Sequence, residues 1–244
     1  MQGRKVEVEI DVELKMRQDE KLGQTGFARE SINPLLINKI KKSGSSIPEQ
    51  FLIQIIPIIQ DSKFDVMACS KTESGHTPAF LISIISKFME ENFGSHPEKG
   101  NCPVKPECVV ISPNRESSAK ISTLAKTFTE ATEMRVVVTS GDTSVQQQME
   151  DARRGCNILI STPGRLLYFV QENIVSLSNV KILVLDRADR LMAEDFKECV
   201  KKIVTSETMP KVEDRQTLIQ CENISLTNEI LRSLGISPII SFVE

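Results

Sequence analysis

The chain has 244 residues, with 30 lysines and arginines against 33 aspartates and glutamates, so its formal net charge is -3 at pH 7. Hydrophobic residues make up 40% and charged residues 26% of the chain, which excludes collagen-like, coiled-coil and wholly disordered proteins. The slightly acidic balance argues against strong non-specific binding of nucleic acid. Because no apolar run reaches the roughly 18 residues that span a bilayer, we expect no contact with a membrane.

The cysteines and aromatic residues exclude two further kinds of site. The six cysteines contain no C-x-x-C pair and the only histidines are His76 and His96, so we expect no metal centre and mostly buried, reduced thiols. Tyr168 is the only tyrosine and tryptophan is absent, which argues against an aromatic stacking surface for single-stranded nucleic acid. The N-terminus has no apolar segment of the secretory kind, so a cytoplasmic or nuclear location is expected.

Residues 1–26 form a highly charged N-terminal extension. Apolar residues alternate in it with charged neighbours, a period of two that is typical of a strand with one apolar face. A charged tail is the alternative, and the pattern leaves both open. Residues 27–244 show no shift in composition and are interpreted as a single domain.

The rest of the chain alternates between short apolar runs and amphipathic segments. Helices are predicted at 32–42, 48–60 and 80–89, around a strand at 64–69 and a loop at 70–77. Further strands are predicted at 108–111, 135–138, 158–160, 182–185, 216–220 and 239–243, and further helices at 116–129, 144–154, 164–172, 189–204 and 227–234. This alternation predicts a three-layer α/β fold with a mostly parallel twisted sheet.

In such a sheet, ligands bind beyond the carboxyl ends of the strands, so functional residues are expected in the loops that follow the strands. We expect the loops at 70–77, 112–116, 139–143, 161–165 and 186–189 to gather at one edge of the sheet. The first has the strand-to-helix context of a phosphate-binding loop, and Gly75 and Thr77 fit its pattern. Glu73 and His76 stand where a glycine and a lysine would be, so this loop alone is interpreted as structural.

The loops together carry a more specific signal. The segments VMACSKTESGHTPAFLISII, ARRGCNILISTPGRLLYFV and ILVLDRADRLM resemble, in order and spacing, the N-terminal RecA-like domain of DEAD-box RNA helicases, and most closely the Vasa-like branch. The resemblance covers about residues 27–244 and implies a RecA-like, P-loop NTPase fold.

The resemblance places a nucleotide site that departs from the family pattern. Phe27 matches the aromatic residue that stacks on the base, whereas Leu52 replaces the glutamine that reads adenine. The family's D-E-A-D reads Asp186-Arg187-Ala188-Asp189, so Arg187 replaces the glutamate that orients the attacking water and cannot act as a base. As a whole, the nucleotide site that the resemblance implies is degenerate. Its positions are Phe27, Leu52, Glu73, Ser74, Gly75, His76, Thr77, Asp186 and Asp189.

These departures predict a site without intact catalytic residues. Glu73 adds a carboxylate where phosphates would lie, and His76 is shorter than lysine and mostly neutral at pH 7. We therefore expect no cofactor; ATP and Mg²⁺ are expected only if some nucleotide binding survives, with Thr77 and Asp186 as the metal-site residues. Glu73 and Arg187 have opposite charges and are predicted to pair across the phosphate site.

The resemblance also implies an RNA-binding set, which is partly intact: Pro113, Asn114, Arg115, Glu116, Gly141, Thr162, Pro163, Gly164 and Arg165. In the family these positions hold RNA phosphates. A structural interpretation competes with this one, because Thr162 and Pro163 suit the start of a helix, and Asp186 and Asp189 are residues that cap helices.

Two further features bear on the expected function. The family's S-A-T element, which couples hydrolysis to unwinding, reads Cys221-Glu222-Asn223, and the sequence stops before a second RecA-like domain. We therefore expect a degenerate DEAD-box helicase-like protein that neither hydrolyses ATP nor unwinds RNA. It would bind a protein partner and/or, weakly, single-stranded RNA in ribonucleoprotein metabolism, in the cytoplasm, a ribonucleoprotein granule or the nucleus. The alternatives are an ATP-dependent RNA helicase with divergent motifs and a weak nucleotide-binding module.

Overall fold

The computed structural model describes most of the chain beyond residue 75 and short stretches before it. The described residues are 8–11, 36, 55–56, 58–60, 65–69, 76–91, 103–130, 132–141, 143–192, 194–223, 231–232, 234–236 and 240–243. The helices expected at 32–42 and 227–234 lie largely outside this part, and so do the predicted site residues Phe27, Leu52, Glu73, Ser74 and Gly75.

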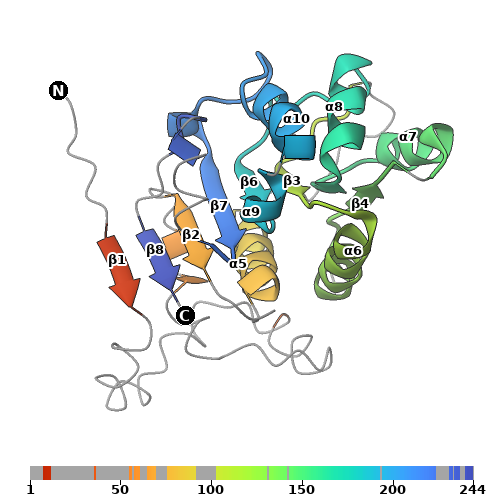
Figure 1. Ribbon diagram of the computed structural model, residues 1–244. Helices are drawn as coiled ribbons and strands as arrows, with labels where there is room; N and C mark the ends of the chain where they lie inside the picture. Colours follow the sequence, from red (N-terminus) through yellow and green to blue (C-terminus); the bar gives the residue numbers. More distant parts are fainter. Residues whose placement is uncertain are drawn as a thin grey trace.

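An all-parallel sheet organises the described residues (Figure 1). Its strands are β1 (Val8–Asp11), β2 (Val66–Cys69), β3 (Cys108–Ile111), β4 (Val136–Thr139), β5 (Ile158–Ser161), β6 (Ile182–Leu185), β7 (Gln216–Cys221) and β8 (Ile240–Val243). Their order is β1-β8-β2-β7-β6-β3-β5-β4, and every pair is parallel. The predicted parallel sheet is confirmed. Within the N-terminal extension, Val8–Asp11 form a strand that pairs with β8 at one edge of the sheet.

Helices cover both faces of this sheet. They are α5 (His76–Glu90), α6 (Arg115–Thr129), α7 (Val145–Arg153), α8 (Pro163–Gln171), α9 (Ala188–Leu191) and α10 (Glu194–Val204), with a 3₁₀ turn at Val212–Asp214. Helices α5 and α6 lie on one face, whereas α7 to α10 lie on the other (Figure 1). The single helix predicted over 189–204 is in fact two, because α9 ends at Leu191 and α10 begins at Glu194. The three-layer α/β prediction is confirmed.

Strands β2, β3, β5 and β6 are buried on both faces, which explains why they consist of continuous, largely apolar runs. Along β2, Val66 and Ala68 pack into the core under α5 and α6, whereas Met67 and Cys69 pack into the core under α8 to α10. All four residues are buried. Both helical layers are therefore held to the sheet by apolar contacts.

At the amino-terminal edge of the sheet, a buried asparagine, Asn157, forms hydrogen bonds to the neighbouring strands. It directly precedes β5. Its side-chain oxygen accepts a hydrogen bond from the backbone N–H of Arg135 at 2.7 Å, and its side-chain nitrogen donates to Glu107 at 3.1 Å. Its carbonyl oxygen accepts from the backbone N–H of Cys108 at 2.9 Å. One side chain thus joins the starts of β3, β4 and β5, at the edge opposite the loops singled out above.

Asn157→Ala should therefore reduce the free energy of unfolding by about 1–3 kcal/mol, because the half-buried backbone N–H of Arg135 and carboxylate of Glu107 lose their hydrogen-bond partner. Urea denaturation at neutral pH measures the loss. Asn173→Gly is the matched control, since Asn173 is exposed and has a φ of 53°, a conformation that glycine adopts without strain. A loss for Asn157→Ala no larger than that of the control would contradict this role.

Candidate functional site

The loops that follow the strands meet at the carboxyl edge of the sheet, as predicted. Backbone hydrogen bonds join Ser112 to Ser161 at 3.0 Å and Thr162 to Thr139 at 3.2 Å. The side chain of Arg165 reaches the carbonyl oxygen of Gly141 at 2.7 Å. Residues 70–75 lie outside the described part, so the gathering is confirmed for the other loops and for the end of this one, at Thr77.

Asp186 is the polar centre of this edge. It directly follows β6 and is only 3% exposed. The Ser112 hydroxyl donates to one of its carboxylate oxygens at 3.0 Å, and the Thr77 hydroxyl donates to the other at 3.1 Å. Burial raises the pKa of Asp186 above its ordinary value of 3.8, and the two hydroxyl donors only partly offset that rise. The carboxyl group therefore links the end of β6 to the end of β3 and to the start of α5.

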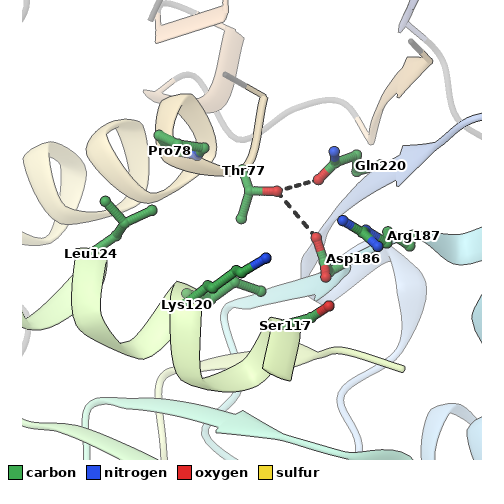
Figure 2. Close-up of a pocket in the computed structure, with 9 residues that line it drawn as sticks. Thr77, Pro78, Ser117, Lys120, Leu124, Asp186, Arg187 and Gln220 are labelled. Atoms are coloured by element: carbon green, nitrogen blue, oxygen red, sulfur yellow. Dashed lines mark hydrogen bonds between the residues drawn. The ribbon is translucent and has the colours of Figure 1, made fainter. Parts of the chain in front are cut away.

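Gln220 joins this group from β7, and the sequence interpretation did not identify it. The Thr77 hydroxyl contacts the side-chain oxygen of Gln220 as well as Asp186 (Figure 2). Because a hydroxyl has a single proton, Thr77 can donate to only one of these two oxygens at a time. Gln220 therefore competes with Asp186 for the Thr77 hydroxyl, the group that the resemblance assigns to a metal ion. The available signal was a polar residue that follows the apolar pair Leu218 and Ile219 near the end of β7.

A pocket of about 150 Å³ opens beside this group, between α5 and α6. Figure 2 shows the polar end formed by Thr77, Asp186, Arg187 and Gln220. The rest of the lining comes from Pro78 of α5 and from Ser117, Lys120, Ile121 and Leu124 of α6. The pocket thus has an apolar wall between the two helices and a polar end with two cations, Arg187 and Lys120, beside one buried carboxyl group.

Arg187 has an unusual backbone conformation. Its φ of 51° and ψ of 58° place it in the left-handed region, which costs a residue other than glycine roughly 1 kcal/mol. It occupies the N-cap position of α9, and its carbonyl oxygen accepts from Arg190 and Leu191 at 2.9 and 3.1 Å. The half-buried side chain lines the pocket beside Asp186. A guanidinium group therefore stands where the resemblance implies a carboxylate.

The structural alternative, in which Asp186 and Asp189 cap the following helix, does not hold for α9, whose N-cap is Arg187. The Asp186 side chain turns inward to the hydroxyls of Ser112 and Thr77. The Asp189 carboxylate accepts from the backbone N–H of Glu222 at 3.1 Å, which joins α9 to the end of β7. In both cases a tertiary hydrogen bond prevails over the local capping preference of aspartate.

Of the other predicted nucleotide-site residues, His76 begins α5 but its side chain lies outside the described part. Glu73 does too, and its pairing with Arg187 therefore stays a prediction. Thr77 and Asp186 supply oxygen atoms of the kind that Mg²⁺ prefers. A Mg²⁺ ion between them would also lie beside the guanidinium of Arg187, so this set of residues fits the ion poorly.

The predicted RNA-binding residues divide into two groups. Asn114 is the N-cap of α6 and accepts from the backbone N–H of Ser117 at 2.8 Å, so its residue type has an internal explanation. Arg165 donates to the carbonyl oxygens of Gly141 and Thr143 at 2.7 and 3.2 Å, and its guanidinium carbon lies 5.7 Å from the ring centroid of Phe169. Both residues therefore help to build the edge itself.

Four of the remaining members, Arg115, Glu116, Gly141 and Gly164, are exposed. The side chain of Arg115 forms no hydrogen bond or ion pair with any described residue. A Cβ atom added at Gly141 or Gly164 would meet nothing within 4 Å. Pro163 is the first residue of α8, and Pro113 is buried. Thr162 holds the N-cap position, but its hydroxyl makes no capping hydrogen bond, so the expected capping role is only half met.

Asp186→Asn should leave the protein at least as stable as the parent at pH 7. Because the folded state raises the pKa of this carboxyl group, the stability that its proton contributes is complete below about 3.8 and is lost as the pH rises through the raised pKa. A neutral amide avoids that loss, so the advantage of the variant should shrink as the pH falls. Urea denaturation between pH 4 and 7 measures this, with Asp214→Asn, an exposed change, as the control. A variant clearly weaker than the parent at pH 7 would mean that the charge is required.

Two further observations concern the described residues alone. None of the helices there is long and apolar enough to cross a membrane. Across the same residues, no three histidine, cysteine, aspartate or glutamate side chains gather as a metal centre would need.

Comparison with known proteins identifies the family. The DEAD/DEAH box helicase family model matches residues 51–220, which is most of the chain. The chain is 35% identical over 209 residues to the ATP-dependent RNA helicase vasa of Drosophila melanogaster, covering 86% of this chain and 30% of that protein. It is 34% identical over 199 residues to the DEAD-box ATP-dependent RNA helicase 52A of Oryza sativa subsp. japonica, covering 80% of this chain and 33% of that one. The chain thus spans about a third of the length of these curated relatives.

The fold is shared as well. A structure of S. cerevisiae Dbp5, solved with Nup159, Gle1, IP6 and ADP, superposes with a TM-score of 0.69 at 16% identity, covering 86% of this chain and 52% of that one. The RecA-like fold that the resemblance implied is confirmed. With the family model matched across both the end of β2 and the Asp186 edge, this chain belongs to the DEAD/DEAH box helicase family.

Proposed function

We propose that this chain is a DEAD-box helicase-like module that neither hydrolyses ATP nor unwinds RNA, and that acts by binding a protein partner and/or RNA in ribonucleoprotein metabolism. The observation that carries the proposal is the position of Arg187. It directly follows the buried Asp186 and lines the pocket that Thr77 also lines. The resemblance places the water-orienting glutamate of the family at this position.

A guanidinium cannot replace that carboxylate. It stays protonated at every accessible pH and has five donors but no acceptor, so it can neither take a proton from water nor hold water as an acceptor does. Its charge also opposes a divalent cation beside Asp186, whose burial already disfavours the charged carboxylate. Both effects weigh against hydrolysis, whatever is bound at residues 70–75.

A weak nucleotide-binding module is the second candidate, and one observation favours it. Thr77 and Asp186, the two residues that the resemblance assigns to the metal, still lie together at 3.1 Å. Any ATP and Mg²⁺ bound there would be held without the water-orienting group, so this candidate differs from the first in affinity for nucleotide and not in turnover.

RNA contact is supported by the shape of the edge near α8. Gly141 and Gly164 leave open space where any other residue would place a Cβ atom. That space lets a phosphate approach the backbone N–H groups at the start of α8. Arg115, which belongs to another of the family's RNA-binding motifs, is exposed and adds a cation to the set. Few contacts of this kind imply weak binding that does not depend on ATP.

Protein contact is supported by a relative. The Dbp5 structure contains two other proteins, Nup159 and Gle1, so the fold is compatible with use as a protein-binding surface. We propose a cytoplasmic location, including ribonucleoprotein granules, with the nucleus as the alternative.

The first test is ATP hydrolysis. Phosphate release from ATP and Mg²⁺ should stay at background with and without single-stranded RNA. The variant Glu73→Gly/His76→Lys/Arg187→Glu should bind a fluorescent ATP analogue about tenfold more tightly than the parent, a change of about 1.4 kcal/mol. RNA-stimulated turnover by the parent would overturn the proposal. A triple variant that binds no better would mean that these three residues are not what weakens the site.

The second test is RNA binding, measured by fluorescence anisotropy with single-stranded RNA at several salt concentrations. Arg115→Glu should weaken binding about tenfold and lower the salt slope by about 1, because one phosphate contact is lost. Arg154→Glu is the matched control: it makes the same charge change at an exposed residue after α7, near the opposite edge of the sheet. Arg165→Ala is less informative, since Arg165 also holds the loop at Gly141. Equal losses in both glutamate variants would point to a different surface.

A further inference from the structure

Two cysteines end neighbouring strands at the carboxyl edge. Cys69 is the last residue of β2 and Cys221 the last residue of β7, and they are Cα partners in the parallel register of those strands. Adjacent strands lie roughly 4.8 Å apart. That separation falls within the range of about 4.4–6.8 Å that disulfides span between Cα atoms.

The two side chains also lie on the same face of the sheet. The neighbouring register pair, Met67 and Ile219, and the pair Cys69 and Cys221 all belong to the core cluster under α8 to α10. Cys69 is 6% exposed and Cys221 is 1% exposed. Both are present as thiols. No other two cysteines in the described strands are register partners, because Cys108 faces Ile158 and Ile182.

We propose that Cys69 and Cys221 are a redox-sensitive thiol pair, which a low-molecular-weight disulfide such as oxidised glutathione converts to an intramolecular disulfide. One protein thiolate attacks a glutathione sulfur, a mixed disulfide forms and one glutathione leaves as thiolate. The second protein thiolate then attacks the protein sulfur of the mixed disulfide, the S–S bond between the strands forms and the second glutathione leaves. Two protein thiols are oxidised, one glutathione disulfide is reduced, and the two protons pass to the departing thiolates.

The pair lies directly beneath the candidate site. Cys69 immediately precedes the segment 70–75, and Cys221 lies between Gln220, which contacts Thr77, and Glu222, whose backbone N–H binds Asp189. A disulfide here would tie the end of β2 to the end of β7, next to Gln220, which lines the pocket. Oxidation would therefore fix the distance between the end of β2 and the strand that carries Gln220. The proposal does not depend on whether the site binds nucleotide or RNA.

Two other cysteines serve as internal controls. Burial raises the pKa of Cys156 to about 12, and it raises the pKa of Cys108 even further. In the folded protein burial limits the reaction of these thiols with glutathione, as it does for Cys69 and Cys221, so the decisive comparison is the one made during refolding. Cys108 has Ile158 and Ile182 as register partners, and Cys156 lies outside the strands. The two thiols are near enough that Cys156 contributes to the raised pKa of Cys108, so a Cys108–Cys156 link is the competing product that the digest must exclude.

The test uses the full chain in glutathione redox buffers. Oxidation is carried out on the folded protein and, separately, during refolding from urea, where burial does not limit access to the thiols. The samples are quenched with acid, alkylated in denaturant, digested without reductant and examined by mass spectrometry. We expect the peptides that contain Cys69 and Cys221 to be joined, and Cys108 and Cys156 to be alkylated.

Three variants make the assignment specific. Cys69→Ser and Cys221→Ser should each abolish the joined peptide and leave the other cysteine as a glutathione adduct or a free thiol. Cys199→Ser, a change at a half-buried cysteine on α10, should leave the joined peptide unchanged. Absence of the Cys69–Cys221 peptide by both routes, or a dominant link through Cys102 or Cys199, would overturn the proposal.

Discussion

The buried carboxyl group of Asp186 is the constraint on which the geometry of the carboxyl edge depends. An isolated carboxylate in the protein interior costs several kcal/mol, so it must be hydrogen-bonded where it lies. Its donors come from two distant parts of the chain, Ser112 at the end of β3 and Thr77 at the start of α5. The ends of β3 and β6 and the start of α5 are therefore fixed relative to one another. Gln220 extends the same group to β7.

This arrangement explains how the edge keeps its shape whatever residue follows Asp186. The hydroxyl donors that satisfy Asp186 belong to the chain itself, at the end of β3 and the start of α5. Arg187 contributes its backbone, and not its side chain, to the start of α9, so its residue type does not alter this frame. The left-handed conformation at this residue costs roughly 1 kcal/mol. That cost is small beside the burial of the apolar helix faces that α9 and α10 bring to the sheet.

Local patterns in the sequence predicted the layers of the fold and missed its long-range polar contacts. The strands at 108–111 and 182–185 were predicted to the residue, because every position in them is apolar and buried. The strand predicted at 135–138 runs instead over Val136–Thr139, because Thr139 pairs with Ser161 through their hydroxyls at 2.7 Å. Gln220 was missed for a similar reason: its partner, Thr77, lies 143 residues away, and no local period reports such a contact. Helix capping by Asp186 and Asp189 was suggested by their residue type alone. Their hydrogen-bond donors, Ser112, Thr77 and Glu222, are distant in the sequence, so a rule based on neighbouring residues does not detect them.

Hydrogen bonds within the domain divide the predicted RNA-binding residues into those whose residue type the fold explains and those whose residue type it does not explain. Asn114 caps a helix and Arg165 anchors a loop, so their presence would be favoured in a domain that binds nothing. Within the described part of the chain, Arg115 has no such partner, and Gly164 has no neighbour that forbids a side chain. A residue type without an internal reason is the better indicator of an external contact, since packing and capping do not maintain it. Arg115 and Gly164, at the starts of α6 and α8, are therefore the positions at which substitutions report best on ligand binding by this domain.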